Sequence, residues 1–234
     1  MRDPTEPAAS PRIAVSLPWL AAWRWGAVLG QLLTVAVVHF ALGVALPLWR
    51  VVSLIGVTAG TNALLVAALG RGVTLPRALA GAILSLDTLV LTALLHATGG
   101  PSNPFSILYL VHITLAAVVL GAEWTWFLAA LAVGCYGVLF ALGGADAMGG
   151  HVHGGGFDLH LQGMWIAFTV AAALTAHFVV SLAAAVDRRD AELAAMRAMA
   201  ERSERLASLT TLAAGAAHAL GSPLATIAVA AKEL

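Results

Sequence analysis

The chain has 234 residues, of which 60% are hydrophobic and only 10% are charged. Soluble domains carry about 25% charged residues, so this composition excludes an ordinary soluble protein and predicts an all-α protein that crosses a membrane several times. The formal net charge is zero, and we expect no direct binding of nucleic acid.

The start of the chain does not look like a cleaved signal peptide. Residues 1–18 contain acidic residues and prolines and have no compact apolar core, whereas a signal peptide has a short apolar segment of its own. We therefore predict that residues 1–24 form a disordered cytoplasmic leader.

Six apolar stretches follow, each close to the 20 or so residues that a helix needs to cross a bilayer. They are residues 25–46, 51–69, 78–97, 106–122, 124–142 and 161–186. We predict a six-helix transmembrane sensor domain over residues 25–186. If both ends of the chain are cytoplasmic, Arg50 is the only arginine or lysine outside, which agrees with the positive-inside rule. The expected location is therefore the plasma membrane.

The connection between the third and fourth stretches is unusually elaborate. It reads Gly99-Gly100-Pro101-Ser102-Asn103-Pro104-Phe105. Paired glycines permit close backbone approach, prolines fix the path, an asparagine offers a donor and an acceptor, and a phenylalanine offers a ring face. A quinone headgroup, which is flat and has two carbonyl acceptors, suits such a cradle. A rigid structural turn is the alternative.

Ionisable side chains inside a bilayer are costly and often functional. The predicted spans contain His39, Asp87, His112 and His177. We expect His39 and His177 to make packing contacts between helices, and the role of Asp87 stays open. Tyr109 and His112 are three residues apart and are predicted to share one helix face below the loop. There they either line a quinone pocket or make packing contacts.

Residues 143–160 form a predicted outer loop rich in glycine and histidine. Its potential metal ligands are Asp146, His151, His153, Asp158 and His160. A His-x-His spacing alone is a weak zinc or copper signal, and ordering so many glycines costs entropy. We therefore expect a floppy loop and no metal site. Cys135, the single cysteine, excludes a disulfide framework within the chain, and we expect it to be a packed small residue.

Residues 187–205 leave the membrane at Asp187-Arg188-Arg189-Asp190 and then contain no glycine or proline. Leu193, Met196 and Met199 are spaced like the apolar seam of a coiled coil. We predict a signalling linker helix that pairs with a second copy of the chain in a homodimer. An amphipathic helix at the membrane surface is the alternative.

Residues 206–234 carry this seam onward and include one histidine. The seam residues are Leu206, Leu209, Ala213, Ala216, Leu220 and Ile227. His218 lies about 200° round the helix from Ala216, so we expect it to face solvent, where a phosphoryl group can reach it. Pro223 cannot donate to the carbonyl of Ala219, which predicts a local kink. We interpret this segment as the first, incomplete helix of a dimerisation and histidine-phosphotransfer domain.

Two motifs resemble one known family. The run from His218 to Leu224, His-Ala-Leu-Gly-Ser-Pro-Leu, resembles the H-box of sensor histidine kinases, His-Glu-Leu-Gly-Thr-Pro-Leu. Residues 99–105 resemble the Gly-Gly-x-x-Asn-Pro-Phe motif of the RegB/PrrB-type redox-sensing kinases. The resemblance implies a bacterial inner-membrane kinase that senses ubiquinone, phosphorylates itself on a histidine and passes the phosphate to a response regulator.

The resemblance also assigns site residues. It makes His218 the phospho-acceptor, and Ser222, which stands where the family has threonine, keeps a hydroxyl that orients water for dephosphorylation. The quinone site carried over is Gly99, Gly100, Asn103, Pro104 and Phe105. Ala219 replaces the acidic residue that commonly holds the imidazole in its reactive tautomer. The predicted acceptor therefore lacks its usual activating carboxylate.

Nothing in the sequence resembles a second bundle helix or an ATP-binding domain with asparagine- and glycine-rich boxes. We expect a fragment or truncated reading of a longer kinase, in which only the full-length protein uses ATP and magnesium. One alternative is a catalytically silent membrane receptor that docks a partner through its C-terminal helix. A small transporter is disfavoured, because we detect no internal repeat and no pair of broken helices.

Overall fold

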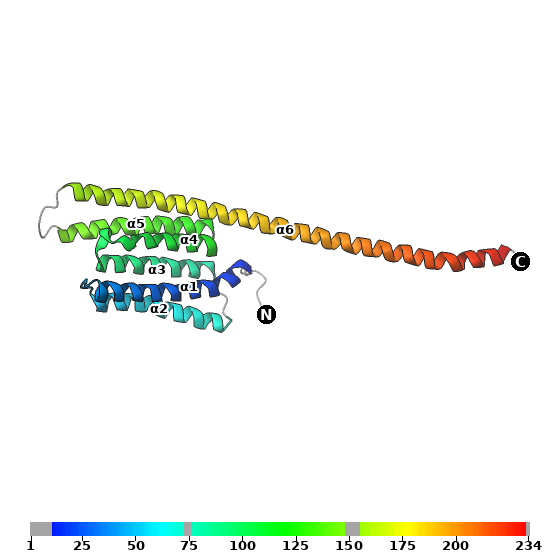
Figure 1. The fold of residues 1–234 in the computed structure, drawn as a ribbon, viewed down its shortest axis with the longest axis horizontal. Coiled ribbons are helices and arrows are strands. Elements are labelled where there is room, and N and C mark those ends of the chain that lie inside the picture. The colour runs from blue at the N-terminus through cyan, green and yellow to red at the C-terminus, as the bar shows by residue number, and fades with distance from the viewer. Residues whose placement is uncertain (1–10, 73–75, 148–154, 233–234) are drawn as a thin grey trace. The chain divides into compact units, whose positions relative to one another are not determined.

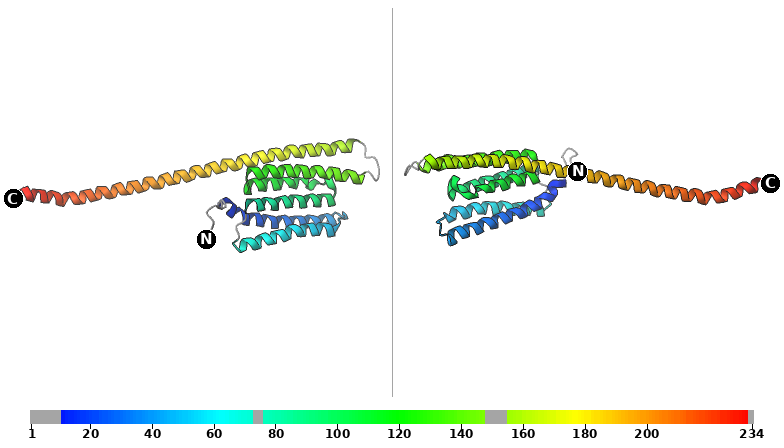
Figure 2. Two further views of the ribbon diagram at one scale, coloured as in Figure 1. Left: turned by 180° about the vertical axis from the view of Figure 1, so that it is seen from behind. Right: turned by 45° about the horizontal axis from the view of Figure 1, so that its top comes forward.

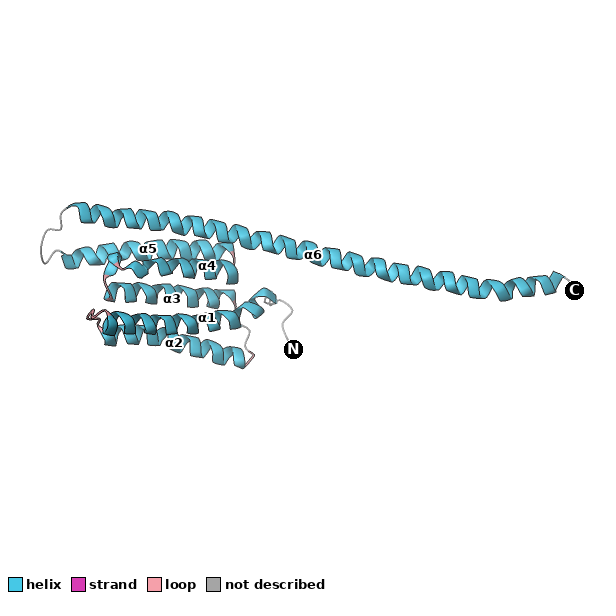
Figure 3. Cartoon of the chain, viewed as in Figure 1, coloured by secondary structure: helices cyan, strands magenta, loops and turns pink. Residues whose placement is uncertain are grey.

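The described part of the chain is all helical, as predicted. A computed structural model describes residues 11–72, 76–147 and 155–232, and these contain no strand (Figures 1 and 3). The α-helices are α1 (Pro11–Ala36), α2 (Leu48–Gly70), α3 (Arg77–Ala97), α4 (Tyr109–Val119), α5 (Ala122–Ala147) and α6 (Gly155–Lys232). A π-helical turn, η1 (Val37–Ala41), follows α1, and two 3-10 turns, η2 (Gly100–Ser102) and η3 (Pro104–Leu108), precede α4.

Among the described residues, five helices are long and apolar enough to cross a membrane. The candidate spans are Pro18–Ala41, Leu48–Gly70, Arg77–Ala97, Ala122–Leu142 and part of Leu159–Leu212. The fourth predicted span, residues 106–122, corresponds instead to a shorter apolar segment, Pro104–Val119. The predicted count of six spans is therefore supported by length and composition for five of them.

The fourth segment is short because its two ends are fixed locally. It starts as the 3-10 turn η3, which rises about 2.0 Å per residue against about 1.5 Å in an α-helix, so it reaches further than its residue count suggests. At its other end Gly121 has φ +91°, a conformation that favours glycine. The Gly121 amide donates to the carbonyl of Ala116 at 3.0 Å, five residues back instead of the usual four, so the regular helix ends here.

The leader prediction was wrong for residues 11–24, which belong to α1. Pro11 is well placed at a helix start, where no amide donor is needed. Leu20 and Ala21 are buried in a core that they share with Leu65, Leu84 and other apolar residues of α2 to α5. This packing with distant segments stabilises the helix and is invisible to a reading of local composition. Residues 1–10 lie outside the described residues.

The helices α1 to α5 lie alongside one another, as both views of Figure 2 show. α1 neighbours α2, α2 neighbours α3, and α5 packs against both α3 and α4. The first part of α6 lies along α5. There the indole N–H of Trp165 donates to the carbonyl of Val133 at 3.2 Å, and Ala172 and Ala176 are fully buried.

The chain divides into two compact units, residues 1–183 and 184–234. The second unit is the later part of α6, so the predicted linker, residues 187–205, is helical as expected. Its seam residues Leu193, Met196 and Met199 are exposed, as are Leu206 and Leu209 beyond them. No contact within this unit covers that seam, and the coiled coil stays a prediction.

Candidate ligand-binding site

The loop between α3 and η3 has a backbone that requires its two glycines. Gly99 has φ +131° and Gly100 has φ +63°, and residues with a Cβ rarely adopt such values. Gly100 begins the 3-10 turn η2, while Gly99 itself is exposed. The predicted glycine pair therefore shapes the path of the loop.

The buried side chain of Asn103 makes hydrogen bonds that stabilise the loop. It is 7% exposed, and its Oδ1 accepts a hydrogen bond from the Phe105 amide at 2.9 Å, which caps η3. Its Nδ2 donates to the carbonyl and to the hydroxyl of Thr98, at 3.1 and 2.8 Å. Both amide donors are within reach of Thr98, so the contacts of this side chain support the loop.

Buried tyrosines anchor the loop to the bundle. The Tyr136 hydroxyl on α5 donates to the carbonyl of Pro101 at 3.0 Å. The Tyr136 ring lies 5.0 Å from that of Phe168 on α6 and 6.3 Å from that of Tyr109 on α4. This cluster connects the loop, α4, α5 and α6.

Tyr109 and His112 have different surroundings, although they are only three residues apart on α4. Tyr109 is fully buried and its hydroxyl donates to Thr92 Oγ1 at 2.8 Å. His112 instead lines a cavity on the α1 side of α4. Of the two alternatives left open for these residues, Tyr109 makes a packing contact with α3, and His112 borders a cavity.

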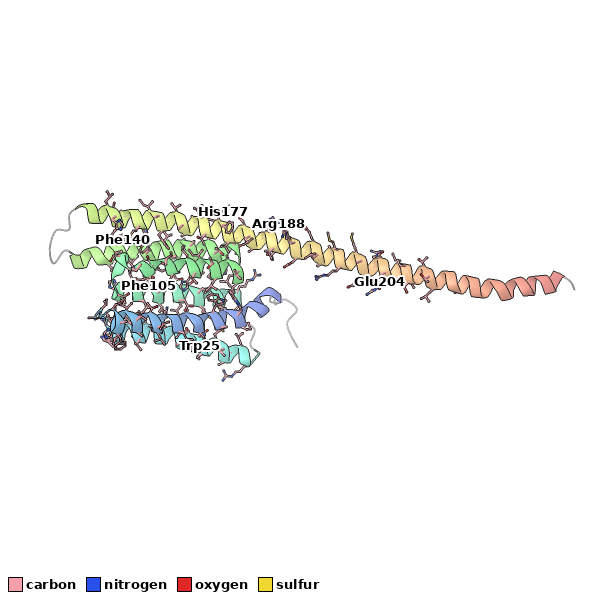
Figure 4. The ribbon with its side chains drawn as sticks, viewed as in Figure 1. Trp25, Phe105, Phe140, His177, Arg188 and Glu204 are labelled. Carbon is pink, nitrogen blue, oxygen red and sulfur yellow. The ribbon has the colours of Figure 1, made fainter. Side chains whose placement is uncertain are left out.

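The cavity lies between α1, α2, α3 and the η3–α4 segment and has a volume of about 550 Å³. Of the five residues predicted to bind quinone, Asn103 and Phe105 line it, whereas Gly99, Gly100 and Pro104 do not. Phe105, on η3, is 39% exposed and is labelled in Figure 4. Most of the wall is apolar, with Val51, Ile55, Leu91, Leu94, Leu95 and Leu115 among its residues.

A buried ion pair lines the same cavity. Arg24 is 3% and Asp87 8% exposed. The guanidinium Nε donates to Asp87 Oδ2 and Nη2 donates to Asp87 Oδ1, both at 2.8 Å. Two parallel bonds of this kind give the most directional form of an arginine–carboxylate pair.

Polar groups on α2 complete the surroundings of Arg24. Its Nη2 also donates to Thr61 Oγ1 at 2.8 Å, and its Nη1 donates to Asn62 Oδ1 at 3.3 Å. Asn62 is fully buried and donates to the carbonyl of Ala21 at 2.9 Å. The network therefore ties α1, α2 and α3 together at the level of the ion pair.

The sequence reading missed this network. It counted Arg24 among the cytoplasmic charges and left Asp87 without a role. A signal was present, because an acid near the middle of one apolar helix requires a buried cation or a polar partner.

Other histidines have different surroundings from those predicted. His39 belongs to η1, where its Nδ1 is 3.2 Å from the carbonyl of Val44 and accepts from the Leu46 amide at 3.4 Å. It supports a local turn and makes no helix-to-helix bond. His177 is exposed on α6 (Figure 4), so it is not packed within this chain.

The predicted outer loop is only partly described. His151 and His153 lie outside the described residues, and His160 is on α6 and exposed. Among the residues that the structure describes, no group of three histidine, cysteine or carboxylate side chains is placed to hold a metal ion. Cys135 is buried on α5 and packed with apolar neighbours, as predicted.

The predicted phospho-acceptor segment is helical. His218, Ala219 and Ser222 all lie on α6, which continues through Pro223 to Lys232. The helix bounds fit the phosphotransfer-helix prediction for residues 206–234, of which 233 and 234 lie outside the described residues.

Comparison with known proteins supports one family. The chain is 31% identical over 213 residues to the sensor histidine kinase RegB of Cereibacter sphaeroides, a match that covers 90% of this chain and 46% of RegB. The chain thus spans about half the length of the curated relative that it matches. No family model matches the chain, and no solved structure matches it either. Across nine-tenths of its length the chain is therefore a relative of the RegB-type sensor histidine kinases.

Proposed function

We propose that this chain is the membrane sensor and phospho-acceptor portion of a two-component histidine kinase that responds to the redox state of the quinone pool. The similarity to RegB supports the kinase assignment. The observation that carries the sensing assignment is the cavity that Asn103 and Phe105 of the motif loop line together.

The cavity suits a quinone in size and chemistry. Its volume of about 550 Å³ lies within the range of 300 to 1,000 Å³ that is usual for small-molecule sites. The apolar wall fits an isoprenoid tail, and the Phe105 ring offers a face for the flat headgroup. Ubiquinone, the quinone of the family resemblance, is the proposed ligand.

The proposed reaction at His218 is phosphoryl transfer. A neutral imidazole nitrogen attacks the terminal phosphorus of ATP, so that a nitrogen–phosphorus bond forms while the bond to the ADP oxygen breaks. The histidine then gives the phosphoryl group to a response regulator. A catalytic domain supplies ATP and magnesium. Ser222 orients water for the dephosphorylation that opposes this transfer.

A second copy of this chain is the proposed partner of the seam on α6. Leu193, Met196 and Met199 are 49%, 65% and 75% exposed within their unit. Large apolar side chains at coiled-coil spacing are usually covered by another helix. Parallel pairing would bring the two His218 residues to the same level of the dimer.

A contact route supports coupling between the loop and α6. Pro101 of the loop accepts a hydrogen bond from Tyr136, whose ring contacts Phe168 on α6. A ligand shifts such a system only when it binds one arrangement of the bundle more tightly than the other. Oxidised and reduced quinone differ in their hydrogen-bonding groups, which provides that difference.

A phosphotransfer assay tests the proposal. The purified chain in proteoliposomes is mixed with a soluble catalytic domain from a related kinase and labelled ATP. We expect label on the parent and none on His218→Gln. Ala219→Glu should raise the initial rate, because a carboxylate restores the group that orients the imidazole.

The silent-receptor alternative is favoured by a single residue, Ala219. If neither the parent nor Ala219→Glu is labelled while a control kinase is labelled in the same mixture, the phospho-acceptor proposal is wrong. The chain would then dock a partner through α6 without accepting phosphate.

A further inference from the structure

We infer that the Arg24–Asp87 ion pair is the headgroup-binding end of the cavity, and that the loop of residues 99–105 closes its other end. This inference rests on the proposed quinone-sensing function and assigns residues that the motif does not contain. Arg24 and Asp87 line the cavity together with Asn103 and Phe105.

The two ends are far enough apart to separate a headgroup from a tail. Asp87 on α3 and Thr98, which caps that helix, both line the cavity and are eleven residues apart, which corresponds to about 16 Å of helix rise. Between them the wall is formed by Leu91, Leu94 and Leu95. An amphiphile in this space meets a charged surface at one end only.

Arg24 retains a donor for a ligand. A guanidinium has five N–H groups, and four contacts of this one are accounted for by Asp87, Thr61 and Asn62. The remaining N–H is on Nη1. At the other end, the Asn103 side chain donates to Thr98 and accepts a hydrogen bond from the Phe105 amide. The ion pair is therefore the better equipped end for a polar headgroup.

The pair offers complementary groups to both redox forms of a quinone. The free Nη1–H can donate to a quinone carbonyl, and the Asp87 carboxylate oxygens have further lone pairs that accept from a quinol hydroxyl. Arg24 and Asp87 are already paired with each other, so the ligand binds to a hydrogen-bond network that is in place before it arrives. The proposal concerns binding only and requires no electron transfer to the protein.

Two small residues of α1 border the cavity. Gly26 and Gly30 line the cavity, and a Cβ added at either position would meet no atom within 4 Å. Larger residues at these two positions would occupy part of the cavity. Trp23 also lines the cavity and supplies an optical reporter of ligand binding.

A titration with ubiquinone-1, a short-tailed quinone, tests the inference through quenching of tryptophan fluorescence in the detergent-solubilised chain. The main variant is Arg24→Met with Asp87→Leu. Removing both charges avoids leaving one buried ion unpaired, which would destabilise the fold. A second variant, Arg24→Lys, keeps the charge pair and loses the guanidinium donor. Helicity and the thermal midpoint verify that each variant is folded.

We expect the double variant and Arg24→Lys each to bind ubiquinone-1 about tenfold more weakly or worse, as loss of a hydrogen bond to a charged group predicts. Gly30→Leu should also weaken binding, and Gly60→Leu, whose Cβ also meets open space but which lies outside the cavity lining, should not.

Parent-like affinity in a folded double variant or in Arg24→Lys overturns the inference, while the proposed function stands because the parent still binds. Absence of saturable binding by the parent overturns the proposed quinone sensing itself, and the inference with it.

Discussion

Asn103 is a motif residue that lines the cavity, yet the polar groups of its side chain bond to neighbouring residues of the loop. Its side chain joins the end of α3 to the start of η3 through Thr98 and Phe105. By fixing these two neighbours, it sets the position of the Phe105 ring at the cavity. The positioning role follows from geometry that the spacing of the motif does not reveal.

Truncation of Asn103 should destabilise the loop. Asn103→Ala removes the η3 cap and leaves polar groups of Thr98 and Phe105 without this partner, at a cost of about 1–3 kcal/mol in the free energy of unfolding. Thermal unfolding in detergent, followed by circular dichroism, measures the change. The matched control is Ser102→Ala, an exposed residue whose hydroxyl contacts only the carbonyl of Gly99. Equal midpoints for the two variants would contradict this role.

Residue roles were predictable where they depended on local sequence. The need for glycine at positions 99 and 100 and the burial of Cys135 follow from residue type and neighbours. The Arg24–Asp87 pair joins residues 63 positions apart, and no periodicity links them. Its discovery required the positions of α1 and α3 in the folded bundle.

At the scale of the helices, close approach is set by a single glycine. A Cβ on Gly81 of α3 would lie 2.4 Å from ring atoms of Trp124 on α5. α3 and α5 are neighbours whose separation is therefore limited by this contact. Since α3 carries Asp87 and much of the cavity wall, the contact also helps to define the site.

Substitution of Gly81 should separate the two helices. Gly81→Ala forces Trp124 to move and should lower the free energy of unfolding by about 1–3 kcal/mol, which is typical of overpacking. Gly60→Ala is the control, because its Cβ meets open space and alanine favours a helix over glycine by about 0.5–1 kcal/mol. Thermal midpoints in detergent compare the two. A Gly81→Ala protein as stable as Gly60→Ala would refute the close contact.

The helices themselves were largely predictable, because apolar length is a strong signal. The differences lie at their ends. Residues 11–24 are helical because Leu20 and Ala21 are buried against distant helices. The fourth segment is short because η3 and Gly121 limit it. Both ends depend on tertiary contacts or backbone angles that composition does not encode.

For the molecule as a whole, the sequence did not reveal where the cavity lies. The loop motif pointed to a quinone, but three of its five residues lie outside the cavity lining. The remaining wall comes from α1, α2, α3 and α4, and a cavity made by four helices exists only once they are packed. The second unit, which carries His218, was predicted as helix and is helix.

The central claim is that a quinone in the membrane unit changes phosphorylation of His218. The most direct measurement is the initial rate of His218 labelling in proteoliposomes that contain either ubiquinone-1 or its reduced form, with a catalytic domain and ATP supplied. We predict rates that differ about fivefold or more, at the lower end of typical allosteric coupling. We also predict that Gly30→Leu abolishes the difference while labelling persists. Equal rates with both redox forms in the parent, with label on His218, would contradict the account.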